Sequence, residues 1–171
     1  MRGTLEYVTL TRELAAQHAE ALAALGRDNA WENWRSENVL MELPDKWRLS
    51  LLALSRGGPA AYAVVSRKLD AAHIHHLIVG ASGRRQGIGK RMLLEIASTC
   101  VREGIGRITL KVSTSNQSAV AFYERWGFRV TAAKGTDLLE MSAHVQTLLA
   151  ALGSARPQEN GAAASAEETP G

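Results

Sequence analysis

Three histidines lie within four residues of the chain, in the segment AHIHHLIV at residues 72–79. The segment becomes apolar and β-branched toward its end, which predicts a strand. Because alternate side chains of a strand point to opposite faces, we expect His73 and His75 on one face and His76, packed, on the other. Imidazole titrates near ~6.5, so this pair could bind a metal ion, carry protons or simply fill a half-buried strand.

A metal site is the least supported of these three interpretations. Two histidines on one face are only half of a tetrahedral ligand set, and no third ligand is evident nearby in the sequence. We therefore predict that the protein holds no metal. Proton transfer and strand packing both stay open on the residues alone.

A basic, glycine-rich turn follows the histidine segment directly. Residues 81–92 read ASGRRQGIGKRM and stand where a strand ends and a helix begins. The first N–H groups of a helix have no partner within it, and glycine lets the main chain approach an anion closely, so the turn suits a phosphate group. Four side chains add positive charge around it: Arg84, Arg85, Lys90 and Arg91.

Two common phosphate-binding motifs do not fit this turn. A P-loop needs a glycine five residues before Gly89 and a Ser or Thr two residues after it, and both places hold arginine. A dinucleotide fingerprint starting at Gly87 needs a glycine where Met92 stands. The pattern Arg84-x-x-Gly87-x-Gly89 remains, with an ordinary basic surface turn as the alternative.

Hydrophobic periodicity predicts a chain of mixed α/β class. A helical pattern runs from Gly87 to Gly104, and a strand at 107–112 follows it. The stretch from His73 to Val112 therefore predicts two parallel strands joined by a helical crossover. Further strands are expected at 5–10, 47–55, 60–67, 127–133 and 137–144, and helices at 11–25, with Thr11 as N-cap and Gly26 as stop, and at 115–126, capped near Ser115.

The composition fits one folded domain. The chain has 171 residues, of which 46% are hydrophobic and 22% are charged, as in ordinary globular proteins. We assign residues 1–153 to a single domain, and residues 154–171, which lack any large apolar side chain, to a disordered tail.

Composition also narrows the location and the partners. No run of the sequence approaches ~18 apolar residues, and its first residues lack a signal-peptide pattern, so neither a membrane partner nor secretion is predicted. Cys100 is the single cysteine, which fits a reducing compartment, so we expect a cytoplasmic protein with Cys100 as a buried apolar side chain. The net charge of +3 is too small to indicate a nucleic-acid partner.

Two motifs, in the right order and at the right separation, carry a family resemblance. The turn matches the pattern Gln/Arg-x-x-Gly-x-Gly/Ala, and a second pattern follows downstream at Asn116, Ala119, Tyr123, Gly127 and Phe128. With these motifs, which together cover residues 72–128, the chain resembles the GNAT superfamily of N-acetyltransferases. The resemblance implies the GNAT fold: a mostly antiparallel sheet with a central splayed parallel pair and helices on both faces.

The resemblance also implies acetyl-CoA as co-substrate and assigns residues to it. Backbone groups of Leu77, Ile78 and Val79 would pair with the pantetheine arm, and Asn116 would contact the co-substrate. Tyr123 would lie beside the thioester sulfur as general acid, with a core aromatic as the alternative. Arg84, which opens the motif, is also assigned to co-substrate binding. The pyrophosphate would be held by the N–H groups of the six residues that follow it: Arg85, Gln86, Gly87, Ile88, Gly89 and Lys90.

The same resemblance bears on the histidines. Many superfamily members that acetylate protein N-termini carry a glutamate five residues before the asparagine, where this chain has Lys111. The segment AHIHHLIV is similar to that of arylalkylamine N-acetyltransferases, in which two alternating histidines take part in proton removal. This similarity implies that His73 and His75 are a base or proton relay, while strand packing stays the alternative.

We predict that the acceptor is a primary amine of a small molecule that attacks acetyl-CoA directly in a ternary complex. The alternatives are a protein or peptide N-acetyltransferase and a catalytically silent acyl-CoA-binding module; a homodimer is left open. Seven side chains could wall the acceptor pocket or hold a cation, or else be core and solvated surface: Trp31, Glu32, Trp34, Glu37, Glu42, Asp45 and Trp47.

Overall fold

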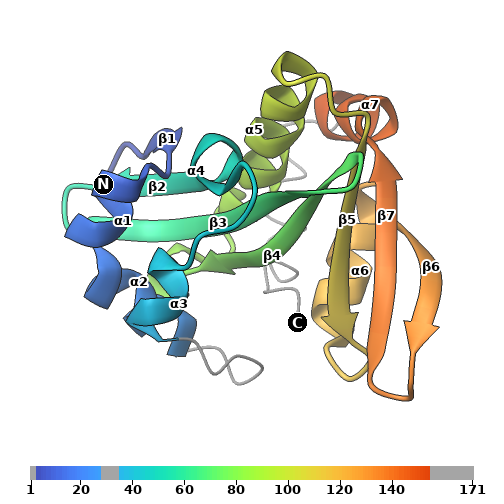
Figure 1. Cartoon of the computed structure of the whole chain (residues 1–171), viewed down its shortest axis with the longest axis horizontal. Helices are drawn as coiled ribbons and strands as arrows, with labels where there is room; N and C mark the ends of the chain where they lie inside the picture. Colours follow the sequence, from blue (N-terminus) through green and yellow to red (C-terminus); the bar gives the residue numbers. More distant parts are fainter. Residues whose placement is uncertain (1–2, 28–34, 155–171) are drawn as a thin grey trace.

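The computed structural model describes residues 3–27 and 35–154, which are organised around a seven-stranded sheet (Figure 1). The strand order is β1-β2-β3-β4-β5-β7-β6, and every neighbouring pair is antiparallel except β4 and β5, which are parallel. The predicted mixed sheet with one parallel pair is confirmed. The strands are Glu6–Thr9 (β1), Leu51–Ser55 (β2), Gly58–Lys68 (β3), Ala71–Val79 (β4), Arg107–Ser113 (β5), Arg129–Lys134 (β6) and Leu138–His144 (β7).

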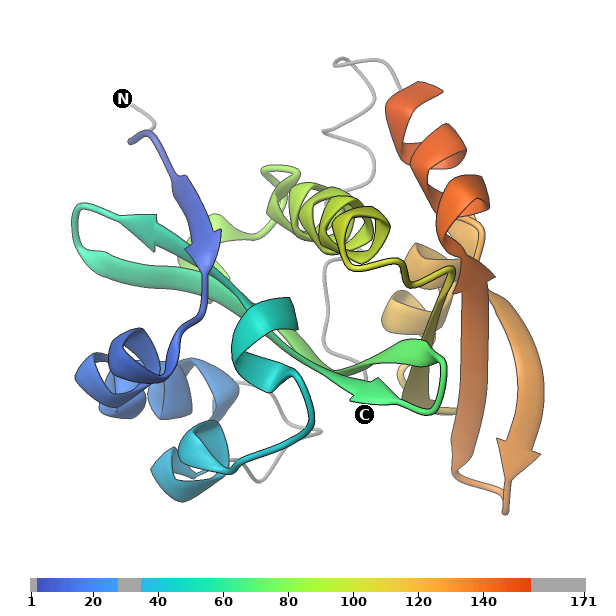
Figure 2. The ribbon, with the colours of Figure 1, turned by 45° about the horizontal axis from the view of Figure 1, so that its top comes forward.

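Helices cover both faces of the sheet, as predicted. In Figure 2, α5 crosses one face of the strands β2 to β4, while α1, α2 and α3 lie on the other face. Among the helices of the described ranges, none is long and apolar enough to span a membrane. The helices are Arg12–Gln17 (α1), Ala19–Arg27 (α2), Ser36–Leu40 (α3), Lys46–Leu49 (α4), Ile88–Arg102 (α5), Gln117–Arg125 (α6) and Val145–Ser154 (α7), with a 3₁₀ turn at Ala81–Gly83 (η1).

Buried apolar side chains form two clusters, one on each face of the sheet. Leu77 and Val79 of β4 belong to the larger cluster, which also takes side chains from α5, α6 and α7. Ile78 of the same strand belongs to the smaller cluster, together with Leu22 of α2 and Tyr62 of β3. Because β4 contributes to both clusters, it is held from both sides, and its polar side chains have fixed positions.

A β-bulge lies among the histidines of β4. Val64 of β3 pairs with His76, but the next residue of β3 pairs with Ile74, so His75 is the extra residue. Val64 faces the smaller cluster, and Ser66, two residues later on β3, pairs with His73. His73 and His76 therefore lie on the same face of the sheet. The prediction that His76 lies on the opposite face is wrong, because the extra residue resets the alternation of side chains.

The two parallel strands separate after three residues of pairing. Ala72, His73 and Ile74 pair with Ile108, Thr109 and Leu110, respectively. Beyond these pairs, β4 continues to Val79 and β5 to Ser113 without pairing to each other. The carboxyl-terminal half of β4 thus presents a backbone edge toward β5 that β5 does not cover, which is the splayed pair that the family resemblance implied.

The N-terminal elements differ from the sequence prediction in three details. The helix expected at 11–25 is two helices that meet at His18, and Gly26 lies inside α2 instead of ending it. Thr11 is the N-cap as predicted, since its side chain accepts a hydrogen bond from the Leu14 N–H. The strand expected at 47–55 starts only at residue 51, because residues 46–49 form α4.

Two differences occur nearer the C-terminus. α6 is capped by Asn116 rather than Ser115, since the Asn116 Oδ1 accepts from the Ala119 N–H at 3.3 Å. α7 follows β7 directly, in a stretch for which the sequence analysis made no prediction. The disordered tail was predicted for residues 154–171; of these, only Ser154 is among the described residues, as the last residue of α7.

Candidate active site

His73 and His75 lie against each other with their rings in a T-shaped contact, 4.8 Å between centroids. The Nδ1 of His73 is 2.8 Å from the Thr109 Oγ1 on β5, and the Nε2 of His75 is 2.7 Å from the Ser66 Oγ on β3. Each imidazole therefore has one ring nitrogen engaged with a hydroxyl group, on a strand at either side of β4. Two oriented imidazoles with one further nitrogen each can pass a proton between a ligand and water.

The surroundings of the two histidines keep them neutral. The pKa of His73 is lowered to about 4, first by burial and then by the nearby charges of His75, Lys68 and Lys111. The pKa of His75 is also lowered to about 4, first by burial and then by neighbouring cationic groups. Both rings are thus uncharged at neutral pH and able to accept a proton.

Tyr123 lies on α6 and is fully buried. Its ring makes T-shaped contacts with Phe122, at 5.2 Å, and Phe128, at 5.3 Å. Its hydroxyl group has no hydrogen-bond partner among the described residues, and burial raises its pKa well above 10. A buried hydroxyl without a partner is costly, which makes this atom a candidate for contact with a ligand.

The basic turn has the geometry of an anion site. Gly87 is the N-cap of α5 with φ 75°, a left-handed conformation that glycine adopts without strain. The N–H groups of Ile88 and Gly89 open the helix, where no carbonyl of a preceding turn can accept them. Arg85 also has a positive φ, 65°, and its side chain is exposed. The turn therefore presents main-chain donors at the positive end of a helix 15 residues long.

The polar side chains of the turn have different roles. The Arg84 Nε donates to the Val79 carbonyl at 3.3 Å, and the Gln86 Nε2 donates to the Ser82 carbonyl at 2.9 Å, so both brace the turn. The Lys90 Nζ lies 5.2 Å from the Trp126 ring centroid. These side chains hold the turn in shape beside the end of β4.

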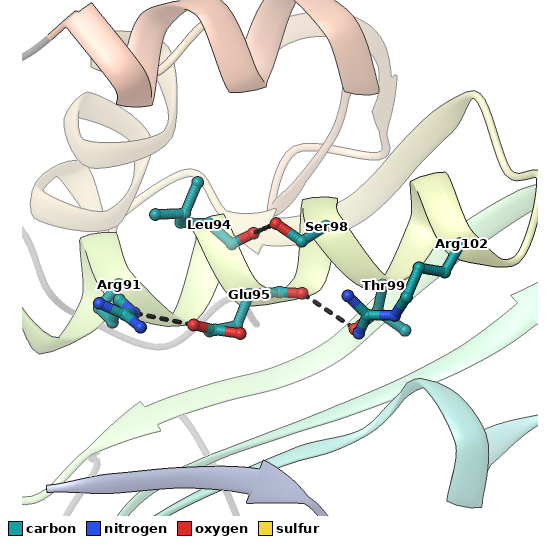
Figure 3. Close-up of polar contacts among 6 residues, drawn as sticks. All are labelled: Arg91, Leu94, Glu95, Ser98, Thr99 and Arg102. Atoms are coloured by element: carbon teal, nitrogen blue, oxygen red, sulfur yellow. Dashed lines mark hydrogen bonds and ion pairs between the residues drawn. The ribbon is translucent and has the colours of Figure 1, made fainter.

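Arg91, one of the four expected cations, is directed along the helix. Figure 3 shows its Nε hydrogen-bonded to Glu95 Oε1, one turn further along α5, at 2.8 Å. Its guanidinium also lies over the ring of Tyr7, 5.2 Å from the centroid. The positive charge nearest the turn therefore comes from Arg84, Arg85 and Lys90.

The remaining predicted contacts of the co-substrate lie around the splayed strands. Leu77, Ile78 and Val79 form the last part of β4, beyond its pairing with β5. Asn116 follows β5, is 2% exposed and caps α6 with its side-chain oxygen. These residues and the turn thus surround the same end of the β4–β5 pair.

The side chains proposed to wall the acceptor pocket do not join the histidines. Glu42 accepts from the Trp47 Nε1 at 2.9 Å and pairs with Arg12 at 2.7 Å. Glu42, Asp45 and Trp47 line a surface hollow. This hollow shares no lining residue with the cavity beside His73. Glu37 is exposed, and the remaining three, Trp31, Glu32 and Trp34, lie outside the described residues.

The structure adds residues that the sequence analysis did not identify. A cavity of about 190 Å³ borders His73 on the sheet face that carries the histidines, and its lining includes Lys68, Arg107, Thr109 and Glu140. Alternation along β5 was a signal for Thr109, because its neighbours Ile108 and Leu110 are core residues. Its contact with His73, 36 residues away, depends on strand pairing that periodicity does not specify.

Two further expectations concern Cys100 and metal ions. Cys100 is buried, and burial raises the pKa of its thiol to about 11, so it is a poor nucleophile at neutral pH. Within residues 3–27 and 35–154, no group of three or more His, Cys, Asp or Glu side chains is arranged to hold a metal ion.

The sequence of the chain is similar to known N-acetyltransferases. The sequence profile of the acetyltransferase (GNAT) family matches residues 10–128. The chain is 31% identical over 80 residues to the ribosomal protein bS18-alanine N-acetyltransferase of Escherichia coli K12, a match that covers 47% of this chain and 54% of that protein. The chain thus spans about half the length of the curated relatives it matches.

Solved structures share the fold at low sequence identity. The ribosomal-protein-S18-alanine N-acetyltransferase from Escherichia coli superposes with a TM-score of 0.70 at 20% identity, over 83% of this chain and 94% of that one. The PaiA N-acetyltransferase from Thermoplasma acidophilum, in complex with coenzyme A, gives a TM-score of 0.67 at 20% identity, over 82% and 99%. At this identity the likeness concerns the fold alone.

Proposed function

The chain belongs to the acetyltransferase (GNAT) family, and from this premise we propose that it transfers an acetyl group from acetyl-CoA to a primary amine of a small molecule. The observation that supports this most is the joint placement of the β4–β5 splay and the main-chain donors at the start of α5. The first offers an uncovered backbone edge, and the second offers a site for a diphosphate.

The residues around the splay fit acetyl-CoA. Leu77, Ile78 and Val79 would bind the pantetheine amides through their main chain, and Asn116 would contact the arm from the end of β5. Residues 84–90 would hold the pyrophosphate. The Tyr123 hydroxyl, which has no hydrogen-bond partner among the described residues, is a polar atom to which such a ligand would supply one. When bound, acetyl-CoA supplies the acetyl thioester that the amine attacks.

The histidines would remove the proton of the acceptor. Most alkylamines are cationic at pH 7, so a base or a water relay is required. With its Nδ1 against Thr109, His73 would accept the proton at Nε2, and His75, whose Nε2 lies against Ser66, would act at Nδ1. Because the pKa of each ring is lowered to about 4, both are in the accepting form but retain the proton weakly, which suits a relay to water.

Tyr123 would act as the general acid. Burial raises its pKa well above 10, so its hydroxyl keeps a proton throughout the neutral range. A thiol titrates near about 8.5, which makes the departing thiolate basic enough to need a proton donor. The buried Cys100, whose thiol pKa is raised to about 11, does not favour a covalent acetyl-enzyme, so we propose direct transfer in a ternary complex.

A protein N-terminus is the second candidate acceptor. It is favoured by the relative whose name assigns it the alanine of a ribosomal protein. It is disfavoured by Lys111, which stands where the resemblance places a glutamate base in such enzymes. A silent acyl-CoA-binding module would need the turn but neither the histidine pair nor Tyr123. One domain over residues 1–153, a cytoplasmic location and the lack of nucleic-acid and membrane partners stay predictions, and a homodimer stays open.

Thiol release from acetyl-CoA, measured against arylalkylamines, polyamines, aminoglycosides and N-terminal peptides, tests this proposal. We expect release above the hydrolysis background with at least one small amine. The variant His73→Ala/His75→Ala should lose turnover and change its pH–rate profile, while His144→Ala, at an exposed position, is the control. Calorimetry that detects no binding of any coenzyme A species would contradict the proposal, and transfer to peptides alone would establish the second candidate.

A further inference from the structure

The cavity beside His73 lies over the paired part of β4 and β5. It is lined by Lys68 at the end of β3, by Arg107 and Thr109 of β5, and by Glu140 of β7. Any amine that His73 deprotonates must come within hydrogen-bonding distance of this ring, so the cavity is where the rest of such an acceptor would lie. Its volume of about 190 Å³ is below the ~300–1,000 Å³ of drug-sized sites, which favours a small acceptor.

Cations stand on both sides of the base. Along β5, Ile108, Leu110 and Val112 point into the core, so Arg107, Thr109 and Lys111 share the opposite face. Thr109 is hydrogen-bonded to His73, and the two cations are each two residues away from it, about 7 Å along the strand. Lys68, from β3, and Arg107 line the cavity itself, whereas Lys111 is not among its lining residues and lies beside it on the same sheet face.

The carboxylates of this face form ion pairs with Arg107 and Lys134, not with Lys68 or Lys111, although Glu140 stands opposite Lys111 in the strand register. Asp70 pairs with Arg107 at 3.2 Å, and Glu140 pairs with Lys134 at 3.9 Å. Within the described part of the chain, neither Lys68 nor Lys111 takes part in an ion pair. Lys68 lines the same cavity as His73, and Lys111 stands two residues from Thr109, the hydrogen-bond partner of His73; the charges of both lysines also lower the pKa of His73.

This excess of positive charge has a consequence for the acceptor. With Arg107 paired to Asp70, this part of the described structure sets Lys68 and Lys111 against Glu140, so positive charge is in excess. A plain alkylamine arrives as a cation and is disfavoured by that excess. An amine that also bears a carboxylate would bring the missing negative charge, and its ammonium group could be received by the partly exposed Glu140.

We propose that the preferred acceptor is a small amino carboxylate, whose carboxylate is bound by Lys68 and Lys111 while its amine lies at His73. This inference rests on the proposed acetyl transfer and names the class of acceptor that the same site takes. The two lysines select the substrate and take no part in proton transfer.

The test compares amines that differ only in a carboxylate. Thiol release would be measured for butylamine against 4-aminobutyrate, and for pentylamine against 5-aminopentanoate. We expect kcat/KM to be at least ~10-fold higher for the carboxylate member of each pair, with a preference that weakens as salt screens the charges. The variant Lys68→Met/Lys111→Met should abolish the preference, and Lys111→Glu should reverse it, whereas Arg102→Met, on α5, is a control that should keep it.

The outcomes separate the two proposals. Equal kcat/KM within both pairs, or a preference that survives in Lys68→Met/Lys111→Met, would overturn the inference while leaving acetyl transfer in place. Release with none of the four compounds and none of the wider amine panel would contradict the transfer itself. Both lysines are outside the buried core, so we expect their variants to unfold at the wild-type temperature. Thermal unfolding of each variant checks this and excludes misfolding as the cause of a lost preference.

Discussion

At the scale of single residues, the proposed acid and the proposed bases differ in what their surroundings do to their pKa values. Burial acts in opposite directions on the two kinds of group, because it disfavours whichever form is charged. It raises the pKa of Tyr123, which stays protonated, and it lowers the pKa values of His73 and His75 to about 4, so they stay neutral. One donor and two acceptors of protons can therefore coexist at pH 7 without added charge.

Tyr123→Phe separates the catalytic role of this residue from a packing role. We expect turnover to fall by about 10–10³-fold with coenzyme A affinity nearly unchanged, as for the loss of one acid–base group. Stability should be kept or slightly raised, because the deleted hydroxyl makes no hydrogen bond in the described structure. Tyr7→Phe on β1 is the matched control. Full turnover in Tyr123→Phe, measured by thiol release, would return the residue to the core.

At the scale of elements, the site depends on departures from regular structure in two strands. The bulge at His75 brings His73 and His76 to one face, and the early end of β4–β5 pairing leaves the last residues of β4 uncovered. α6 begins where β5 ends, because Asn116 caps it, and this cap fixes the helix that carries Tyr123. The position of Tyr123, the proposed general acid, thus depends on a helix terminus.

Variants of Asn116 distinguish capping from co-substrate binding. Asn116→Ala removes the oxygen that accepts from Ala119 and should cost about 1 kcal/mol of unfolding free energy. Asn116→Asp keeps an acceptor oxygen at the start of α6, where a negative charge is favoured, and should keep stability. It loses the amide donor, however, and adds a negative charge near the proposed co-substrate site. We therefore expect both variants to bind coenzyme A more weakly in calorimetry, and only the alanine variant to unfold earlier in urea. Wild-type affinity in Asn116→Asp would limit this residue to capping.

At the scale of the whole molecule, the sheet has two differently covered halves. Helices α1 to α3 close the histidine-bearing face over the N-terminal strands, whereas the larger cluster with α5, α6 and α7 lies on the opposite face (Figure 2). Over β5 and β7 that histidine-bearing face carries polar residues such as Thr109, Lys111 and Glu140. The candidate acceptor cavity lies where the covered and the polar halves meet.

The lowered pKa values of His73 and His75 make global stability depend on pH. The pKa of histidine in an unfolded chain is ~6.5, whereas the pKa values of His73 and His75 are lowered to about 4 in the folded protein. Between these two pH values the unfolded chain therefore binds more protons than the folded one. The contribution of both histidines to stability is therefore present above pH 6.5 and lost as pH falls toward 4, with a slope of at most about 1.4 kcal/mol per pH unit for each histidine.

Urea unfolding at several pH values between 7 and 5 measures this slope. We expect the free energy of unfolding to decrease as the pH is lowered from 7 to 5. The decrease should be less steep in His73→Gln/His75→Gln, because the glutamine amides keep hydrogen-bonding capacity but do not take up a proton. His144→Gln, at an exposed position, should keep the wild-type slope. Identical slopes in all three proteins would show that His73 and His75 do not titrate as the structure implies.

The sequence by itself determined what depends on short stretches of chain. The turn at Gly87, the helix that follows it and the spacing from Asn116 to Tyr123 are set by rules that act over a few residues, and these features also carried the family resemblance. Thr11 as a helix cap was predictable for the same reason.

Only the tertiary structure decided which distant side chains meet. The bulge at His75 exists only in the pairing with β3, and the contact of His73 with Thr109 joins residues 36 apart through the pairing with β5. Likewise, Glu42, a candidate for binding a cation, is engaged by Arg12. Register and ion pairing follow from how whole elements pack, and hydrophobic periodicity fixes the face of a residue only until an inserted residue shifts it.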